Sequence, residues 1–408
     1  MSDLSLHYPA GVCFLRTNSY FQLQPRNSGL TAFSGIRSCN LSVTSPTLQP
    51  LGNTPATPTT ISFSLEALSH RHPVLTAIAH TSLRPFLIRD IISLLETRLS
   101  SDSFRGMPIP PSLQVLITLR FLACGTFHRE TGDLCGVSEP TVCKIVHKVC
   151  KAICELKDDY IKFPDAAGQA NYKVEFFEYG NFLGVIGCID GCHIPIKCPS
   201  TADSEEYRNR KNWFSINVQS VCTPTMQFSN IVARWKGATH DSRIFQNSCL
   251  YAQFEGGQHS GIILGDSGYA QTNFLFTPYL HAVTPEQQRY NQAHIRTRGT
   301  VERMFGVWKS RFQCLRNTLR FEPRRCCIVI IATAVLHNYL KQHGCPDPQM
   351  EHRDEPDLPM VEPDNDRYGL ACRDAFDLRK MRQYKKFKFC MMLFVMYLDQ
   401  NEATFQSD

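Results

Sequence analysis

The chain has 408 residues, of which 43% are hydrophobic and 20% are charged, and its formal net charge is +6. This composition is that of a globular protein, and the length allows two or three domains with a sizeable core. The longest apolar run near the C-terminal end, residues 389–398, is about half as long as a membrane helix, so no membrane association is expected.

The sequence contains 18 cysteines but no CxxC pair and no N-terminal pattern of a secretory signal peptide. The thiols are therefore expected to be free and buried, in a reducing compartment. Cys188, Cys192 and Cys198 cluster around Asp190 without the usual spacing of a zinc site, so structural zinc is the weaker alternative.

Both ends of the chain differ in composition from its middle. Residues 1–80 are rich in Ser, Thr, Pro, Asn and Gln without periodicity, which predicts a disordered N-terminal extension. Residues 346–408 are interpreted as an acidic linker and a C-terminal tail, since 347–366 contains eight Asp and Glu against one Arg. The folded part is expected between these two segments.

The region 83–156 has the periodicity of helices. A helix over 83–99 is followed by one that is expected to begin at a Ser112 cap and to end at Gly125. A short helix then stops at Gly136. The sequence therefore predicts an all-helical region before any strand appears.

The last helix of this region spans 138–153, with Ser138 at its N-cap position and one apolar stripe. With the short helix and the turn before it, it has the spacing of a helix-turn-helix. A DNA-reading helix would present its cations to phosphates and base edges, whereas in a plain helical bundle the same face would be solvated. The cations concerned are Lys144, Lys148 and Lys151.

After a polar connection over 160–180, short apolar runs of strand type begin at Phe182. Strands are expected over 182–197, 214–223, 227–235 and 261–266, with a helix after Asp241 and two more around 297–312 and 323–343. The order β-β-β-α-β and then helices predicts an α/β domain over 182–345, with a ribonuclease-H-like mixed sheet and flanking helices.

The apolar runs in two of these strands each stop on an aspartate, Asp190 and Asp266, and a third acid, Glu302, lies on a basic helix. Carboxylates that converge from separate elements suit Mg²⁺ or Mn²⁺, and two such ions can stabilise both oxygens in phosphodiester hydrolysis. Each aspartate could instead start a loop, and Glu302 could pair with Arg298. Asp241 is either a helix N-cap or another metal ligand. The pattern favours a metal-dependent nuclease.

Residues 289–325 carry ten Lys and Arg against two Glu, a net charge of +8. Such a strip near candidate metal ligands indicates a polyanionic partner, with a solvated helix face as the alternative. The cations expected along DNA are Arg296, Arg298, Arg303, Lys309 and Arg311.

Several blocks of the chain, in order, resemble the DDE transposase domain of the PIF/Harbinger family and its domesticated relatives, the harbinger transposase-derived nucleases. The blocks are residues 184–194, 211–219, 240–245, 265–269, 301–309 and 336–338, and upstream 119–125 and 136–142 resemble the family's helix-turn-helix. The resemblance covers about residues 83–345. Cys192 departs from it, because Thr is usual there, and residues 1–80 and the tail from about 370 do not match.

This resemblance implies that Asp190, Asp266 and Glu302 are the catalytic acids and that Asp241 is a further metal ligand. It also implies a divalent cation as cofactor, DNA as substrate, and the nucleus as location, with the cytoplasm as a second compartment. A Myb-like DNA-binding partner protein and a homo-oligomer are further family expectations. The rival hypothesis is a domesticated DNA-binding or scaffold protein with a catalytically silent core.

Overall fold

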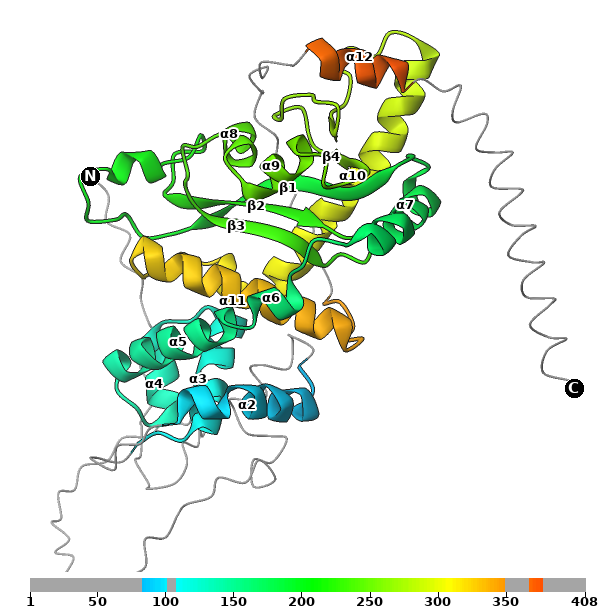
Figure 1. The fold of residues 1–408 in the computed structure, drawn as a ribbon. Coiled ribbons are helices and arrows are strands. Elements are labelled where there is room, and N and C mark those ends of the chain that lie inside the picture. The colour runs from blue at the N-terminus through cyan, green and yellow to red at the C-terminus, as the bar shows by residue number, and fades with distance from the viewer. Residues whose placement is uncertain (1–82, 101–107, 349–366, 377–408) are drawn as a thin grey trace, which may run out of the picture. The chain divides into compact units, whose positions relative to one another are not determined.

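A five-stranded sheet with helices on both faces forms the centre of the structure (Figure 1). The computed structural model describes residues 83–100, 108–348 and 367–376. These residues belong to the compact unit Ser62–Asp408. The expected extension over 1–80 and the apolar run 389–398 lie outside the described residues, as does most of the acidic linker.

The sheet is mixed and has the strand order β3-β2-β1-β4-β5. Strands β1, β2 and β3 are antiparallel neighbours, whereas β4 is parallel to β1 and β5 is parallel to β4. The strands are Val185–Pro195 (β1), Ser215–Cys222 (β2), Phe228–Lys236 (β3), Ile262–Leu264 (β4) and Leu275–Phe276 (β5). The four expected strands and their order are confirmed, and β5 escapes sequence reasoning because two residues carry no periodic signal.

Helices bury their apolar side chains on each face of the sheet. On one face, α8 (Asp241–Gln246) and α9 (Cys249–Glu255) share a cluster of buried side chains with Ile189 of β1. On the other face lie α10 (Pro285–Arg311) and α11 (Pro323–Gln342), and Trp308 of α10 meets the ring of Phe228 edge-on at 5.1 Å. Both predicted long helices are thus confirmed.

The helical region before the sheet contains α2 (Pro85–Leu99), α3 (Pro111–Cys124), α4 (His128–Cys135) and α5 (Glu139–Cys154). Gly125 and Gly136 end α3 and α4 with positive φ values of 63° and 69°, as their positions predict. The expected Ser112 cap is wrong, because Pro111, whose ring fixes φ, takes the first helical position and Pro110 precedes it. The shorter elements are α6 (Lys157–Tyr160), η3 (Ser204–Tyr207), η4 (Gln313–Leu315) and α12 (Arg367–Ala375).

The expected polar connection over 160–180 is largely a helix, α7 (Ala166–Gly180). The side chain of Asp165 caps it by accepting a hydrogen bond from the Gly168 amide at 2.8 Å. Among the α7 side chains, Phe176 and Gln169 are buried, so the segment shows little of the apolar periodicity that identifies a helix.

The glutamate-bearing helix also begins earlier than expected, at Pro285 rather than near residue 297. Thr284 and Gln287 form a reciprocal capping box at its start. The polar first turns hide this beginning from a search for apolar stripes, whereas the cap residues would have revealed it.

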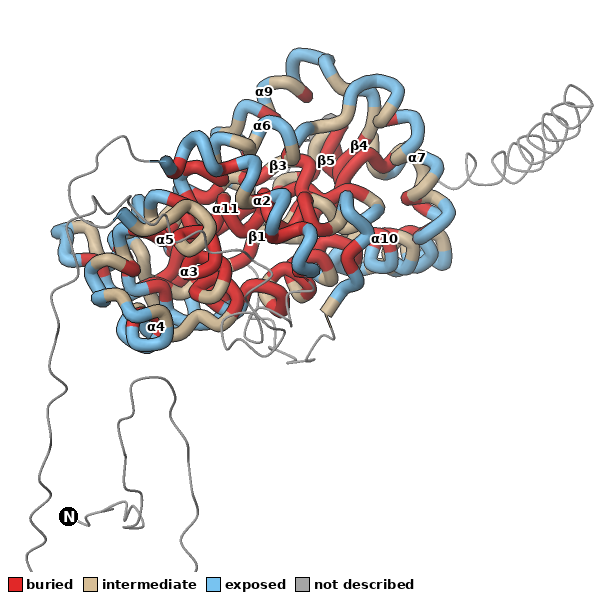
Figure 2. Tube along the Cα trace, turned by 90° about the horizontal axis from the view of Figure 1, so that it is seen from below, coloured by how far each residue is buried: buried red, intermediate tan, exposed pale blue. Residues whose placement is uncertain are grey.

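Buried positions run without a break from α3 and α5 through α11 to the strands (Figure 2). Asn338 of α11 ties this core together, because its Oδ1 accepts from the Phe228 amide at 2.8 Å. Its Nδ2 donates to the carbonyls of Phe228 and Tyr160 at 2.7 and 2.8 Å. In the described part of the chain, no helix combines the length and apolar character needed to cross a membrane.

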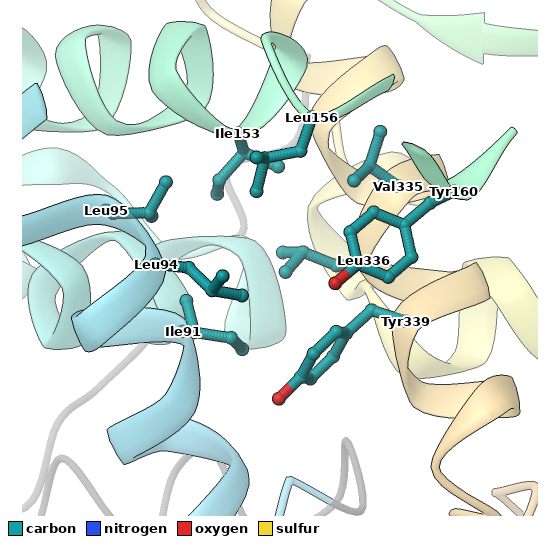
Figure 3. A pocket seen from close by; sticks show the side chains of 9 residues that line it. All are labelled: Ile91, Leu94, Leu95, Ile153, Leu156, Tyr160, Val335, Leu336 and Tyr339. Atoms are coloured by element: carbon teal, nitrogen blue, oxygen red, sulfur yellow. The ribbon is translucent and has the colours of Figure 1, made fainter. Parts of the chain in front are cut away.

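A small apolar pocket lies between α2, α5, α6 and α11 (Figure 3). Its lining is aliphatic except for Tyr160 and Tyr339, whose rings meet edge-on at 5.7 Å. None of its lining residues is one of the candidate acids. A phosphodiester would find few polar partners there, whereas the candidate acid Asp190 lies on the sheet.

Candidate active site

Asp190 lies in the middle of β1, not at its end as the sequence suggested. Pairing with β2 continues past it, with Asp190 opposite Ser220 and Pro195 opposite Ser215. The strand runs on because residues after Asp190 still alternate into the core, where Ile194 is fully buried. Asp190 was therefore singled out as the end of a strand, although it lies inside β1.

The Asp190 carboxylate has two hydrogen-bond donors. Its Oδ1 accepts from the Gly191 amide at 2.9 Å, and its Oδ2 accepts from Arg298 Nη1 at 3.2 Å. Burial raises the pKa of Asp190 to about 8; the Arg298 charge opposes this shift, and the carboxylates of Asp266 and Asp241 add to it. Without enough positive charge nearby, this carboxyl would therefore hold a proton at neutral pH.

Asp266 reaches the same part of the sheet through strand register. In the parallel pair of β1 and β4, Cys188 lies opposite Leu264, and each of these residues precedes an aspartate by two positions. Asp266 Oδ1 accepts from the Gly268 amide at 3.0 Å in the turn after β4. Parallel strands bring equivalent positions side by side, so this register places Asp266 next to Asp190.

Asp241 is the first residue of α8, and His240, not Asp241, occupies the N-cap position. Its Oδ1 accepts from Asn217 Nδ2 at 2.7 Å, and its backbone carbonyl accepts from Gln219 Nε2 at 2.9 Å. Burial raises the pKa of Asp241 to about 6, although the Asn217 hydrogen bond lowers it. The N-cap alternative is therefore wrong, and Asp241 is a half-buried acid held by β2.

Asp241 approaches β1 from the face opposite to that of Asp190. Its Oδ1 would lie 2.3 Å from a Cβ atom added at Gly191, so the missing side chain makes room for the carboxylate. Neighbouring residues of a strand point to opposite faces, so Asp190 belongs to the α10 face and Gly191 to the α8 face. The structure thus gathers Asp190, Asp241 and Asp266 but separates two of them across the strand.

Glu302 of α10 is the most exposed of the four acids, with 54% of its side chain accessible. Arg298 Nη2 donates to Glu302 Oε1 one helical turn away, as the ion-pair alternative predicts. Arg298 therefore joins Glu302 to Asp190, and only 18% of its side chain is exposed. Sequence reasoning placed Arg298 along DNA, whereas the structure places its guanidinium among the acids.

A divalent cation such as Mg²⁺ needs several oxygen donors that converge on one point. Across the described ranges, no three His, Cys, Asp or Glu side chains are grouped so that they could hold a metal ion. The chemistry nevertheless fits, because carboxylate oxygens are what Mg²⁺ and Mn²⁺ prefer, and the crowded aspartates need positive charge. In this arrangement Arg298 supplies that charge.

A polar network that sequence reasoning missed supports the site. Gln219 Nε2 donates to the hydroxyl of buried Tyr269 at 3.0 Å as well as to Asp241, and thereby ties β2 to the turn after Asp266. Asn217 and Gln219 are both almost completely buried. Their alternation with the apolar residues Ile216 and Val218 was the available signal, since buried amides need partners.

Residues 189–338 match a family model described as a DDE superfamily endonuclease, and this range contains all four acids and Arg298. Over 259 residues the chain is 35% identical to the protein named Putative nuclease HARBI1 of Homo sapiens, covering 62% of this chain and 74% of that relative. The chain belongs to the harbinger transposase-derived nuclease family. This confirms the resemblance inferred from the motifs.

More distant members of the family occur among the matches. The chain is 31% identical over 265 residues to Putative nuclease HARBI1 of Xenopus laevis, covering 64% of this chain and 76% of that protein. It is 24% identical over 257 residues to Protein ALP1-like of Arabidopsis thaliana, covering 59% and 63% of the two chains. No solved structure matches the chain.

The cations predicted on α5 of this harbinger-family protein lie at its surface. Lys144, Lys148 and Lys151 are all exposed. Lys148 Nζ donates to the carbonyl of Leu99 at 2.7 Å and so also holds the end of α2. Lys144 and Lys151 are the more accessible candidates for contact with a polyanion.

The cations predicted on α10 have different environments. Arg296 is exposed, whereas the guanidinium of Arg303 lies 4.8 Å from the centre of the Tyr179 ring. Lys309 Nζ donates to the carbonyl of His193 at 3.2 Å. Arg311 is completely buried and donates to the carbonyl of Pro346 at 2.9 Å, so its place in this structure is the core and not a DNA-facing surface. Its position after the exposed turns of α10 gave no sign of this burial.

Proposed function

We propose that this protein is a metal-dependent nuclease that hydrolyses DNA phosphodiester bonds, built on a ribonuclease-H-like sheet. One observation carries the proposal. Three half-buried aspartates gather at β1, β4 and α8 within the residues that match the endonuclease family, and desolvation raises the pKa of two of them. A carboxylate cluster of this kind is costly without bound cations, and perturbed carboxylates of this kind are typical of active sites.

Each acid has a distinct proposed role. Asp190 and Asp266, adjacent through the β1–β4 register, would hold the divalent cation, and Glu302 would join them from α10. Asp241, fixed by Asn217, would act from the other face of β1. When bound, Mg²⁺ or Mn²⁺ would supply positive charge to the attacking and leaving oxygens of the phosphodiester.

Arg298 is proposed to position the acids and not to contact DNA along the helix. It pairs with Asp190 and Glu302 together, and its charge opposes the burial-driven rise in the pKa of Asp190. Both remain ready to accept a cation in exchange for the guanidinium. This exchange explains why the acids suit a divalent cation although Arg298 provides the positive charge beside them in this structure.

The remaining proposals follow the family expectation. The helix α5, with Lys144 and Lys151, would act as the second helix of a helix-turn-helix on DNA, and Arg296 would contact the backbone near the acids. A nuclear location, with some protein in the cytoplasm, a Myb-like DNA-binding partner protein and a homo-oligomer belong to the same proposal.

The test is nicking of supercoiled DNA with Mg²⁺ or Mn²⁺. Asp190→Asn and Asp266→Asn should each reduce the rate by about 100-fold or more, since ligands and their supports commonly change activity on that scale. Asp158→Asn, which alters an exposed acid on α6, should leave the rate unchanged. Equal nicking by all four proteins would exclude this assignment.

A second candidate function is DNA binding or scaffolding with a silent core. It is favoured by the ion pairs through which Arg298 already neutralises the acids, and by the lack of a preformed metal-binding group among the described residues. Titration calorimetry with Mn²⁺ separates the candidates. If the core is silent, the heat of Mn²⁺ binding should be the same for the wild type and for Asp190→Asn. If the core binds metal, Asp190→Asn should reduce that heat.

A further inference from the structure

The segment between α10 and α11 carries exposed cations that lie beside α5. Arg320, Arg324 and Arg325 are exposed, and Arg325 Nη1 reaches Cys143 Sγ of α5 at 3.8 Å. Arg325 also acts electrostatically on His147 of α5. The N-terminal end of α11 therefore adjoins the outer face of α5, where Lys144 and Lys151 project.

This segment is firmly attached to the helical region. The ring of Phe321 packs edge-on against Phe121 of α3 at 5.7 Å and lies 4.9 Å from the ring of His128 of α4. Asn317 Nδ2 donates to the carbonyls of Cys124 and Gly125 at 3.4 and 3.3 Å. The cations that follow Phe321 thus have a fixed position relative to α3, α4 and α5.

Arg320 is held outward by an exposed aromatic ring. Its guanidinium carbon lies 4.5 Å from the centre of the Phe127 ring, and 54% of Phe127 is exposed. A guanidinium over an aromatic face keeps its hydrogen-bond donors free at the edge of the plane. Arg320 can therefore offer paired donors to a phosphate while the ring limits its motion.

We propose that these cations form one binding surface for the backbone of duplex DNA, which we call the basic ridge. Its members are Lys144, Lys151, Arg320, Arg324 and Arg325. Lys144 and Lys151 are seven positions apart on α5, about 10 Å along the helix, which spans roughly three phosphates of one strand. The inference rests on the proposed function. It adds that residues after α10 and residues of α5 bind the same DNA duplex.

A duplex suits the basic ridge better than an acidic peptide. The cations come from α5, from the loop before α11 and from the first turn of α11, so three separate segments of the chain contribute to the surface. Duplex DNA offers two rows of phosphates to such a surface. Glu139 and Glu322 are also exposed nearby, and the cations outnumber them.

The test measures binding of a labelled DNA duplex by the full chain in EDTA, where nicking is absent, over a range of salt concentrations. Arg324→Gln/Arg325→Gln should weaken binding several-fold and lower the salt slope by about two, since each phosphate contact contributes about one. Lys144→Gln/Lys151→Gln should do the same. Arg89→Gln/Lys162→Gln, which removes one exposed cation from α2 and one from the loop after α6, should change neither.

The outcomes separate the basic ridge from the nuclease. If the variants lose DNA binding although neither they nor the wild type nick DNA with Mn²⁺, the ridge stands and the nuclease fails. If the wild type nicks DNA but the ridge variants bind like the control pair, the ridge is wrong. Loss of polyglutamate binding with unchanged DNA binding would also overturn it, in favour of an acidic protein partner.

Discussion

Arg298 Nη1 lies 3.2 Å from Asp190 Oδ2, and the same guanidinium donates to Glu302. Both members of the first pair are largely buried, with 18% and 16% of their side chains exposed. One arginine thus joins the acid of the central strand to the acid of the long helix. Its guanidinium therefore lies among the candidate acids of the site.

Replacing this arginine should destabilise the protein most when metal is absent. Arg298→Gln leaves the carboxylates of Asp190 and Glu302 without their shared partner, which should cost about 1.5–3 kcal/mol, the range for hydrogen bonds to charged groups. In thermal unfolding, Mn²⁺ should raise the unfolding temperature of the variant by more than it raises that of the wild type. The exposed neighbour variant Arg296→Gln is the control, and equal effects in the two variants would contradict the role of Arg298.

The acid cluster should also make stability depend on pH. The pKa of Asp190 is raised from 3.8 to about 8 in the folded protein, so the folded state binds more protons than the unfolded state between these values. Its contribution is therefore full below about pH 4 and is lost as the pH rises towards 8. The difference in unfolding free energy between wild type and Asp190→Asn, measured in EDTA, should fall over this window. If the difference stays constant with pH, the pKa of Asp190 is not raised in the metal-free protein and this prediction fails.

Gly191 should tolerate no side chain. A Cβ atom there would lie 2.3 Å from Asp241 Oδ1, so Gly191→Ala must displace α8 or the strand. Overpacking of this kind costs typically about 1–3 kcal/mol, measurable by urea unfolding, and nicking should fall with it. Gly299→Ala is a matched control, since its Cβ would meet Arg303 at 3.8 Å and alanine favours a helix. Comparable losses in both variants would show that the effect is not specific to Asp241.

Asn338 should be a residue of the fold and not of the chemistry. Asn338→Ala removes the partners of the buried amide and carbonyl of Phe228, so unfolding should become easier by about 2–4 kcal/mol. At a temperature where the variant is folded, nicking per folded molecule should match the wild type. A variant as stable as the wild type would refute the proposed anchoring of β3 to α11.

The sequence was sufficient to predict four of the five strands and the apolar parts of α10 and α11, and it singled out the candidate acids. Apolar runs and stripes can be recognised from consecutive residues, whatever the pairing of the strands. Asp190, Asp266 and Glu302 stand out because they lie next to such patterns. The sequence did not reveal that Asp190 sits within β1, because the end of an apolar run is not the end of hydrogen-bond pairing.

Two other features depend on tertiary packing that no local pattern encodes. Asp241 and Asp190 lie on opposite faces of β1 because α8 packs over Gly191, a position that only the folded sheet defines. Arg298 and Arg311 look alike in a basic helix, yet one enters the acid cluster and the other the core. A count of Lys and Arg along the helix does not distinguish these two from exposed cations, because the helices and strands that pack against α10 decide which side chains are buried.

The most direct test of the account exchanges a proposed metal ligand for a softer one. Asp190→Cys should fail to nick supercoiled DNA with Mg²⁺ and should regain part of its activity with Mn²⁺, because a thiolate is a poor ligand for Mg²⁺ and a better one for later, softer ions. Wild type should work with both ions. Nicking by Asp190→Cys with Mg²⁺ at the wild-type rate would contradict the proposal that Asp190 holds the metal.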